Sequence, residues 1–175
     1  MKKVSIILFS IALTLLLQAC SVQEKMSPQI FLDRLSKINT RLDFDTSEQF
    51  YEGNEFVCLI SDINTNSYAF QISVNDSGDC KKISLAAEKT DEEAFDECVK
   101  SIIKVYAPDD DAEKVISSLC SNSNNNQKFQ YYETQWHSYS FAAEKECRYF
   151  SVSSKKLVNE SNVDLSLKPN DKIDF

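Results

Sequence analysis

The segment Ser67–Asn75 alternates strictly between large apolar side chains and small or polar ones. The apolar side chains are Tyr68, Phe70, Ile72 and Val74. The small or polar side chains between them are Ser67, Ala69, Gln71 and Ser73. Because successive side chains of a strand point to opposite faces of a sheet, this pattern predicts an antiparallel strand with one buried face. Such a strand needs partner strands beside it and a second layer that covers its apolar face.

Five more strand-like runs and three amphipathic helices supply these partners. The expected strands are Glu55–Asp62, Ser67–Asn75, Cys80–Ala86, Lys128–Gln135, Trp136–Ala143 and Cys147–Ser154, and the helices begin at Ser27–Pro28, at Thr90 and at Asp109–Asp111. We therefore predict one α+β domain over residues 28–158, with an antiparallel sheet of about six strands and three helices on one face. The polar stretch Asn39–Gly53 is expected to be irregular, and residues 159–175 form a polar tail.

A short motif occurs twice among the expected strands. Ser67-Tyr68-Ala69-Phe70 matches Ser138-Tyr139-Ser140-Phe141, and each copy leads to a strand that begins with a cysteine. One interpretation is a tandem repeat of a helix and three strands; the other is coincidence, because strands favour these residues. The expected second half, two helices then three antiparallel strands, resembles two families in topology alone. These are the small outer-membrane assembly lipoproteins and the secreted β-lactamase inhibitory proteins, and the resemblance implies a fold but no function.

Alternation predicts which side chains face the helices. The helix-facing set is expected to be Tyr68, Phe70, Ile83, Leu85, Tyr139, Phe141, Phe150 and Val152, and the opposite set to include Cys80, Cys147, Tyr149, Ser151 and Trp136. Three helices cover one side of a six-stranded sheet, so aromatic side chains on the other side are candidates for a contact face. We assign Tyr132, Trp136 and Tyr149 to that face; the alternative is that the C-terminal tail covers them.

The N-terminus has the pattern of an export signal. Lys2 and Lys3 precede an apolar run, Val4–Leu17, which is shorter than the ~20 residues that a membrane-spanning helix needs. The following Leu17-Gln18-Ala19-Cys20 resembles the lipobox of bacterial lipoproteins. The resemblance implies that residues 1–19 are a cleaved signal peptide, that Cys20 carries lipid such as palmitate, and that residues 20–27 are a tether. With serine at position 21, it implies the outer membrane of a Gram-negative cell or the outer face of a Gram-positive plasma membrane.

The other five cysteines would then meet an oxidising compartment, which favours disulfides. The helices on either side of Ala107-Pro108 are expected to be antiparallel neighbours, with Cys98 and Cys120 at similar distances from the turn. We therefore predict a Cys98–Cys120 bridge. Cys80–Cys147 is the candidate second pair and leaves Cys58 free; the competing pair, Cys58–Cys80, leaves Cys147 free.

Composition excludes several functional classes. A net charge of -8 disfavours a nucleic-acid binder, two glycines disfavour phosphate-binding loops, and one histidine excludes a multi-histidine metal site. No catalytic constellation, cofactor site or metal site is expected. We predict a lipid-anchored, non-catalytic envelope or cell-surface module that binds a macromolecular partner, a protein or an envelope polymer, or supports envelope assembly. The alternative is a proteinaceous enzyme inhibitor or protective protein held at the envelope, and an enzyme ranks third.

Overall fold

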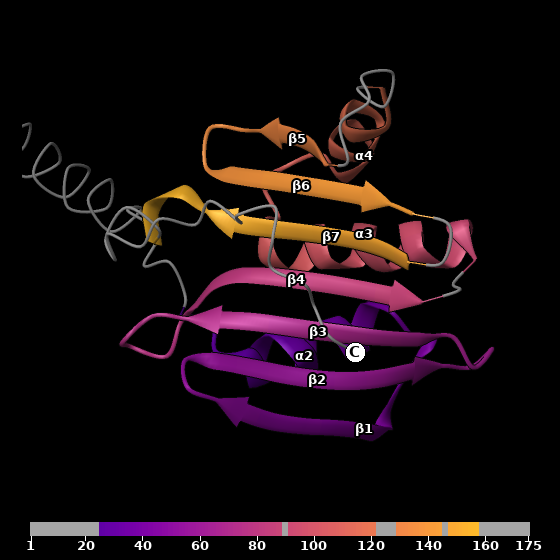
Figure 1. The fold of residues 1–175 in the computed structure, drawn as a ribbon. Helices are drawn as coiled ribbons and strands as arrows, with labels where there is room; N and C mark the ends of the chain where they lie inside the picture. The colour runs from indigo at the N-terminus through magenta and orange to yellow at the C-terminus, as the bar shows by residue number, and fades with distance from the viewer. Residues whose placement is uncertain (1–24, 89–90, 122–128, 145–146, 158–175) are drawn as a thin grey trace, which may run out of the picture.

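The computed structural model describes residues 25–88, 91–121, 129–144 and 147–157. Its seven strands form one antiparallel sheet in the order β1-β2-β3-β4-β7-β6-β5 (Figure 1). The strands are β1 (Leu42–Glu52), β2 (Glu55–Asp62), β3 (Ser67–Val74), β4 (Cys80–Glu88), β5 (Gln130–Glu133), β6 (His137–Ala143) and β7 (Cys147–Ser154). The described helices are α2 (Pro28–Ile38), α3 (Glu92–Tyr106) and α4 (Ala112–Ser121). The predicted α+β class is confirmed, whereas residues 1–19, Cys20 and residues 159–175 lie outside the described ranges.

Local side-chain bonds define where each helix begins. The Ser27 hydroxyl accepts a hydrogen bond from the Ile30 amide, with Pro28 in the first turn of α2. At α4, one carboxylate oxygen of Asp111 accepts from the amides of Glu113 and Lys114. The N-cap of α3 is Asp91, one residue after the expected Thr90, which is outside the described residues.

The helices lie on one face of the sheet, behind it in Figure 1. Register places Phe70, Leu85 and Phe150 side by side across β3, β4 and β7, and Phe141 follows on β6. The Phe31 ring of α2 lies 6.4 Å from Phe70, between ring centroids, and the Phe95 ring of α3 lies 6.2 Å from Phe141. The predicted helix-facing set is thus confirmed, and it forms the core. The opposite side of the sheet is called the outer face below.

The expectation that Asn39–Gly53 is irregular is wrong, because this stretch contains β1. β1 is an edge strand that pairs only with β2, and its register shifts between Asp43 and Glu48. Most of its side chains are exposed. An exposed edge strand has no need of an alternating apolar pattern, since backbone hydrogen bonds to its neighbour hold it in place.

A second irregularity reverses the expected orientation of Cys80. Ser73 pairs with Lys82, but the next residue, Val74, pairs with Cys80, so the register shifts at the start of β4. The extra residue of such a bulge changes the face of the side chains before it. Cys80 is therefore buried in the core on the helix side, whereas alternation alone had predicted the outer face.

The strand register also bears on the repeat hypothesis. Phe70 pairs with Leu85 on β4, whereas Phe141 pairs with Phe150 on β7. The sequence alignment that equates Phe70 with Phe141 and Cys80 with Cys147 would instead place Phe141 beside Val152. The strand pairing in the second half is therefore shifted by two residues from the pairing that the alignment predicts. The tandem repeat stays a hypothesis.

The sheet has two distinct ends. The β1–β2, β3–β4 and β5–β6 turns lie together at the left of Figure 1, and the amide of Cys80 donates to the carbonyl of Met26 there at 2.7 Å. We call this the tether end, because the N-terminal segment joins the domain at Met26. The opposite far end holds the β2–β3 turn, the start of α3 and the β6–β7 connection.

Candidate binding surface

A shallow groove of about 390 Å³ opens on the outer face at the far end of the sheet. Its floor is built from the Leu59 side chain of β2 and from small side chains of β3 and β4, namely Ser67, Ala69 and Ala86. Leu59 is 41% exposed, because it lies on the face of the sheet opposite the helices (Figure 1). The small residues beside it leave room for an incoming side chain.

Two carboxylates flank this apolar floor. Glu48 stands on β1 just after the register shift, and Glu88 is the last residue of β4; both are exposed and both line the groove. Thr46 from the irregular part of β1 completes the edge. The groove therefore combines an apolar floor with an acidic rim.

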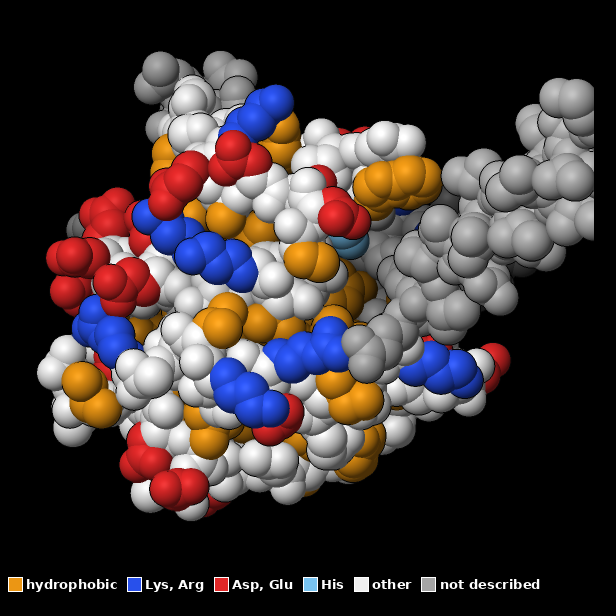
Figure 2. All heavy atoms as spheres, turned by 180° about the vertical axis from the view of Figure 1, so that it is seen from behind, with side chains coloured by type: hydrophobic (Ala, Val, Ile, Leu, Met, Phe, Trp, Pro, Cys, Tyr) orange, Lys and Arg blue, Asp and Glu red, His pale blue; other side chains and the backbone are white. Residues whose placement is uncertain are grey.

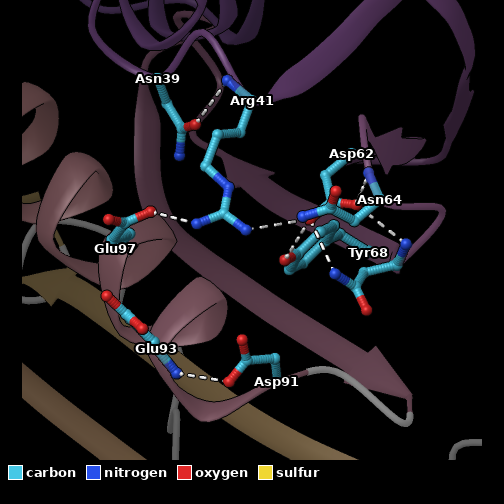
Figure 3. Close-up of polar contacts among 9 residues, drawn as sticks. Asn39, Arg41, Asp62, Asn64, Tyr68, Asp91, Glu93 and Glu97 are labelled. Carbon is cyan, nitrogen blue, oxygen red and sulfur yellow. Dashed lines mark hydrogen bonds and ion pairs between the residues drawn. The ribbon is translucent and has the colours of Figure 1, made fainter.

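A polar network behind the groove holds the β2–β3 turn in place (Figure 3). Asp62, the last residue of β2, accepts hydrogen bonds at one oxygen from the amides of Asn64 and Asn66, at 2.8 and 2.9 Å. Its other oxygen accepts from the Asn66 side chain at 2.8 Å. Burial acts to raise the pKa of Asp62, but these hydrogen bonds outweigh it and the pKa lies below its usual value.

Arg41 connects this turn to α3. Its guanidinium lies 2.6 Å from a Glu97 oxygen and 3.9 Å from an Asp62 oxygen. Three elements distant in sequence are thus joined at the far end: the residue before β1, the end of β2 and the first turns of α3. The network fixes the end of β2, and with it the position of the groove.

Acidic side chains gather over the start of α3, at the left of Figure 2. Asp91, Glu92, Glu93, Asp96 and Glu97 line a depression there with Lys100. Partial burial, and then the charge of Glu92, raise the pKa of Asp96. Arg148 reaches this region from β7 and lies 3.4 Å from Glu92. The far end is therefore acidic on the helix side as well as at the groove.

A second buried carboxylate, Asp110, lies at the tether end. One of its oxygens accepts hydrogen bonds from Tyr139 at 2.6 Å and Thr134 at 3.0 Å, and lies 2.7 Å from Nδ1 of His137. The His137 and Asp110 side chains are both nearly buried. This cluster ties the α3–α4 turn to Thr134 and to β6, and among the described residues no serine or cysteine side chain is hydrogen-bonded to the histidine ring.

The three predicted contact-face aromatics do not share a face. Tyr132 pairs with Tyr139 and packs against the core on the helix side. Tyr149 is on the outer face, half-buried, where its hydroxyl donates to the Ser84 hydroxyl at 3.2 Å. Trp136 lies in the β5–β6 turn at the tether end and is 54% exposed. The assignment of a single contact face is therefore wrong, because the pairing of β5 with β6 places Tyr132 beside Tyr139 on the helix side and Trp136 lies in a turn rather than in a strand.

No disulfide joins any of the five cysteines in the described ranges. Cys80 and Cys147 are on opposite faces, and Cys147 pairs with Glu88 at the other end of β4, ~26 Å along the strand at ~3.3 Å per residue. Cys58 and Cys80 are separated by β3. Each of these two pairings is therefore incompatible with this arrangement.

Cys98 and Cys120 also have different surroundings. Cys98 is fully buried and interacts with Asp62 and Tyr68, while Cys120 is exposed and interacts with Asp96 and Glu92. On α3, Asp96 and Cys98 are about 200° apart around the helix axis, so their side chains point to nearly opposite sides of the helix. Cys120 is therefore near the side of α3 that carries Asp96, and not the side that carries Cys98. The structure thus contains no Cys98–Cys120 bridge, and that pairing stays a prediction for the oxidised protein.

Comparisons of the chain with known protein families, with curated proteins and with solved structures found no match. Among residues 25–88, 91–121, 129–144 and 147–157, no group of three or more His, Cys, Asp or Glu side chains could hold a metal ion. Within the same part of the chain, no helix is long and apolar enough to cross a membrane.

Sequence reasoning did not find the groove. The signal was present in Phe56-Val57-Cys58-Leu59-Ile60, an unbroken apolar run in which alternate residues must face opposite sides of the sheet. Phe56, Cys58 and Ile60 occupy the buried side, so Leu59 is left on the outer face. Glu48 and Thr46 carried no such signal, because they were read as part of an irregular segment.

Proposed function

We propose that this protein is a lipid-anchored, non-catalytic module of the bacterial cell envelope or surface, and that it binds a macromolecular partner in the groove at its far end. The proposal rests on one observation: the N-terminal part of the chain and the groove lie at opposite ends of the sheet. The chain that follows Cys20 joins the domain at Met26, whereas the groove around Leu59 opens at the far end. An anchored domain of this shape presents the groove away from the membrane.

The groove's chemistry supports a polypeptide partner. An exposed leucine beside alanine and serine accepts an apolar side chain, and burial of apolar surface stabilises association by ~25 cal/mol per Å². Glu48 and Glu88 at the rim favour a cationic residue next to that apolar side chain. The partner segment is therefore expected to combine an apolar residue with lysine or arginine.

The test is site-directed photo-crosslinking in intact cells that produce the full-length protein. A photoreactive side chain at position 59 should give a discrete cross-linked product, and one at position 63 should not. Ile63 is a matched control, because it is exposed, apolar and at the far end, but outside the groove. Leu59→Asp should reduce partner capture, while Ile63→Asp should not.

Two outcomes would change the proposal. Equal cross-linking from both positions, or unchanged capture by Leu59→Asp, would show that the groove is not the binding site. A cross-linked partner that proves to be a single enzyme, inhibited on binding, would instead favour the alternative of an anchored inhibitor or protective protein.

A further inference from the structure

The exposed aromatic side chains of the described residues are concentrated at the tether end. Tyr51 and Phe50, near the end of β1, are 57% and 46% exposed, and Trp136 precedes β6. The remaining exposed aromatic, Tyr131, lies on β5. Tryptophan and tyrosine favour the interface between lipid headgroups and acyl chains, because their rings are apolar and their N–H or O–H group is polar.

These aromatics lie on both sides of the point where the tether enters. Met26 contacts the start of β4, in the middle of the sheet. Trp136 is beside β6, two strands away or ~10 Å, and the end of β1 is three strands away in the other direction, ~14 Å at ~4.8 Å per strand. An aromatic group thus stands at each corner of this end, with the tether between them.

The length of chain before Lys25 limits the distance to a membrane. From Cys20 to Lys25 the chain extends at most ~18 Å, at ~3.3–3.6 Å per residue. A lipid on Cys20 therefore keeps Lys25, and with it the tether end of the domain, within ~18 Å of the bilayer.

We propose that the tether end is itself a membrane-contact surface, on which Trp136 at one corner and Phe50 at the other insert into the headgroup region of the bilayer that holds the anchor, while Tyr51 stays bonded to Gln29 of α2. This inference rests on the lipid anchor of the proposed function. It goes further, since it gives the domain a fixed end-on orientation rather than free rotation on its tether. Basic and acidic side chains are mixed at this end, where Glu52, Asp76, Asp79, Asp109 and Glu133 accompany Lys25, Lys155 and Lys156, so the contact relies on the aromatic rings rather than on attraction to anionic headgroups.

The single tryptophan of the chain allows a direct test. The full-length lipidated protein is reconstituted into vesicles of phosphatidylethanolamine and phosphatidylglycerol, with brominated phosphatidylcholine as a quencher. Trp136 fluorescence should shift to shorter wavelength and be quenched relative to unbrominated vesicles. Raising the salt concentration should leave the quenching largely unchanged, because an apolar contact is not screened.

The control moves the tryptophan to the other end of the molecule. In Trp136→Phe combined with Ile63→Trp, the only tryptophan lies in the β2–β3 turn at the far end, and its fluorescence should not be quenched. Circular dichroism melting checks that both proteins are folded. Equal quenching at both positions, or an unquenched Trp136, would overturn the inference.

Failure of the anchor gives a different result. If the lipoprotein proposal is wrong, the protein will not sediment with vesicles and will not incorporate a fatty acid. If the anchor is right and the end-on contact is wrong, the protein will sediment while Trp136 remains unquenched.

Discussion

At the residue scale, two buried carboxylates organise the polar contacts of the domain. Asp62 satisfies the backbone of the β2–β3 turn, and Asp110 joins the α3–α4 turn to Thr134, His137 and Tyr139. An ionised carboxylate can accept several hydrogen bonds at once, which makes aspartate effective where a turn must be held against a sheet. Each therefore contributes to stability in its charged form.

Replacement of Asp110 by asparagine should lower the free energy of unfolding at neutral pH by about 1–3 kcal/mol, because a charged acceptor of three hydrogen bonds is lost. Burial acts to raise the pKa of Asp110, but hydrogen bonds from Tyr139, His137 and Thr134 outweigh it and lower the pKa. A lowered folded-state pKa means that the stabilisation is complete above the ordinary aspartate pKa of about 4 and is lost as the pH falls through the folded-state value.

Urea unfolding at a series of pH values measures this effect. The difference between wild type and Asp110→Asn should be constant above about pH 4 and should shrink below it. Asp109→Asn is the matched control, since this exposed neighbour should change stability by no more than ~0.5 kcal/mol. A pH-independent difference would contradict the role of the charge.

The thiols should differ sharply in reactivity. In the native, reduced protein, iodoacetamide should modify the exposed Cys120 and leave Cys58, Cys80 and Cys98 unmodified. Burial raises the pKa of Cys80 to about 12. The reactive thiolate form of Cys80 is therefore scarce, in addition to the reagent having no access to the buried sulfur. Peptide mass mapping before and after denaturation provides the measurement. A disulfide-linked pair of peptides containing Cys98 and Cys120 in the unreduced protein would show that the predicted bridge forms and that α3 and α4 move to make it.

At the scale of elements, irregularities in β1 and β4 decide what the sheet presents to solvent. The register shift in β1 places Glu48 beside the groove, and the shift at the start of β4 turns Cys80 into the core. Each inserts an odd offset into an otherwise alternating strand, so the side chains on either side of it change faces.

The β2–β3 turn contains a strained residue, Thr65, with a φ of 66°. A left-handed conformation is unfavourable for a β-branched side chain, so Thr65→Gly should raise the free energy of unfolding by up to about 1 kcal/mol. Asn64→Gly is the matched control in the same turn; it relieves no positive φ and should lower stability by about 0.5–1 kcal/mol. Thermal melting of both variants distinguishes the two effects, and a loss of stability in Thr65→Gly would show that the strain argument fails.

At the scale of the whole molecule, most of the exposed aromatic side chains and the acidic-rimmed groove lie at opposite ends of the strands. Glu88, the start of α3 and Glu144 make the far end acidic, and three of the four exposed aromatics of the described residues, Phe50, Tyr51 and Trp136, lie at the tether end. A domain held by a short lipidated tether would use these ends differently, one toward the bilayer and one toward a partner.

The anchor itself is testable without the structure. Cys20→Ala should release the protein from membranes or leave an uncleaved precursor, because two or more acyl chains are needed for stable attachment. Metabolic labelling with a fatty acid should mark the wild type and not the variant. A wild type that is unlabelled and recovered in the soluble fraction would end the lipoprotein proposal.

The sequence by itself determined the α+β class, most strand positions and the helix-facing core, because alternation and helix-capping residues act over a few neighbours in the chain. Phe70, Leu85 and Phe150 were placed correctly for that reason. Only the tertiary structure decided the presence of β1, the orientation of Cys80, the separation of Tyr132, Trp136 and Tyr149, and the groove at Leu59. Those features depend on pairing with a neighbouring strand, on bulges and on where a turn begins, and such long-range contacts leave no local periodic signal in the sequence.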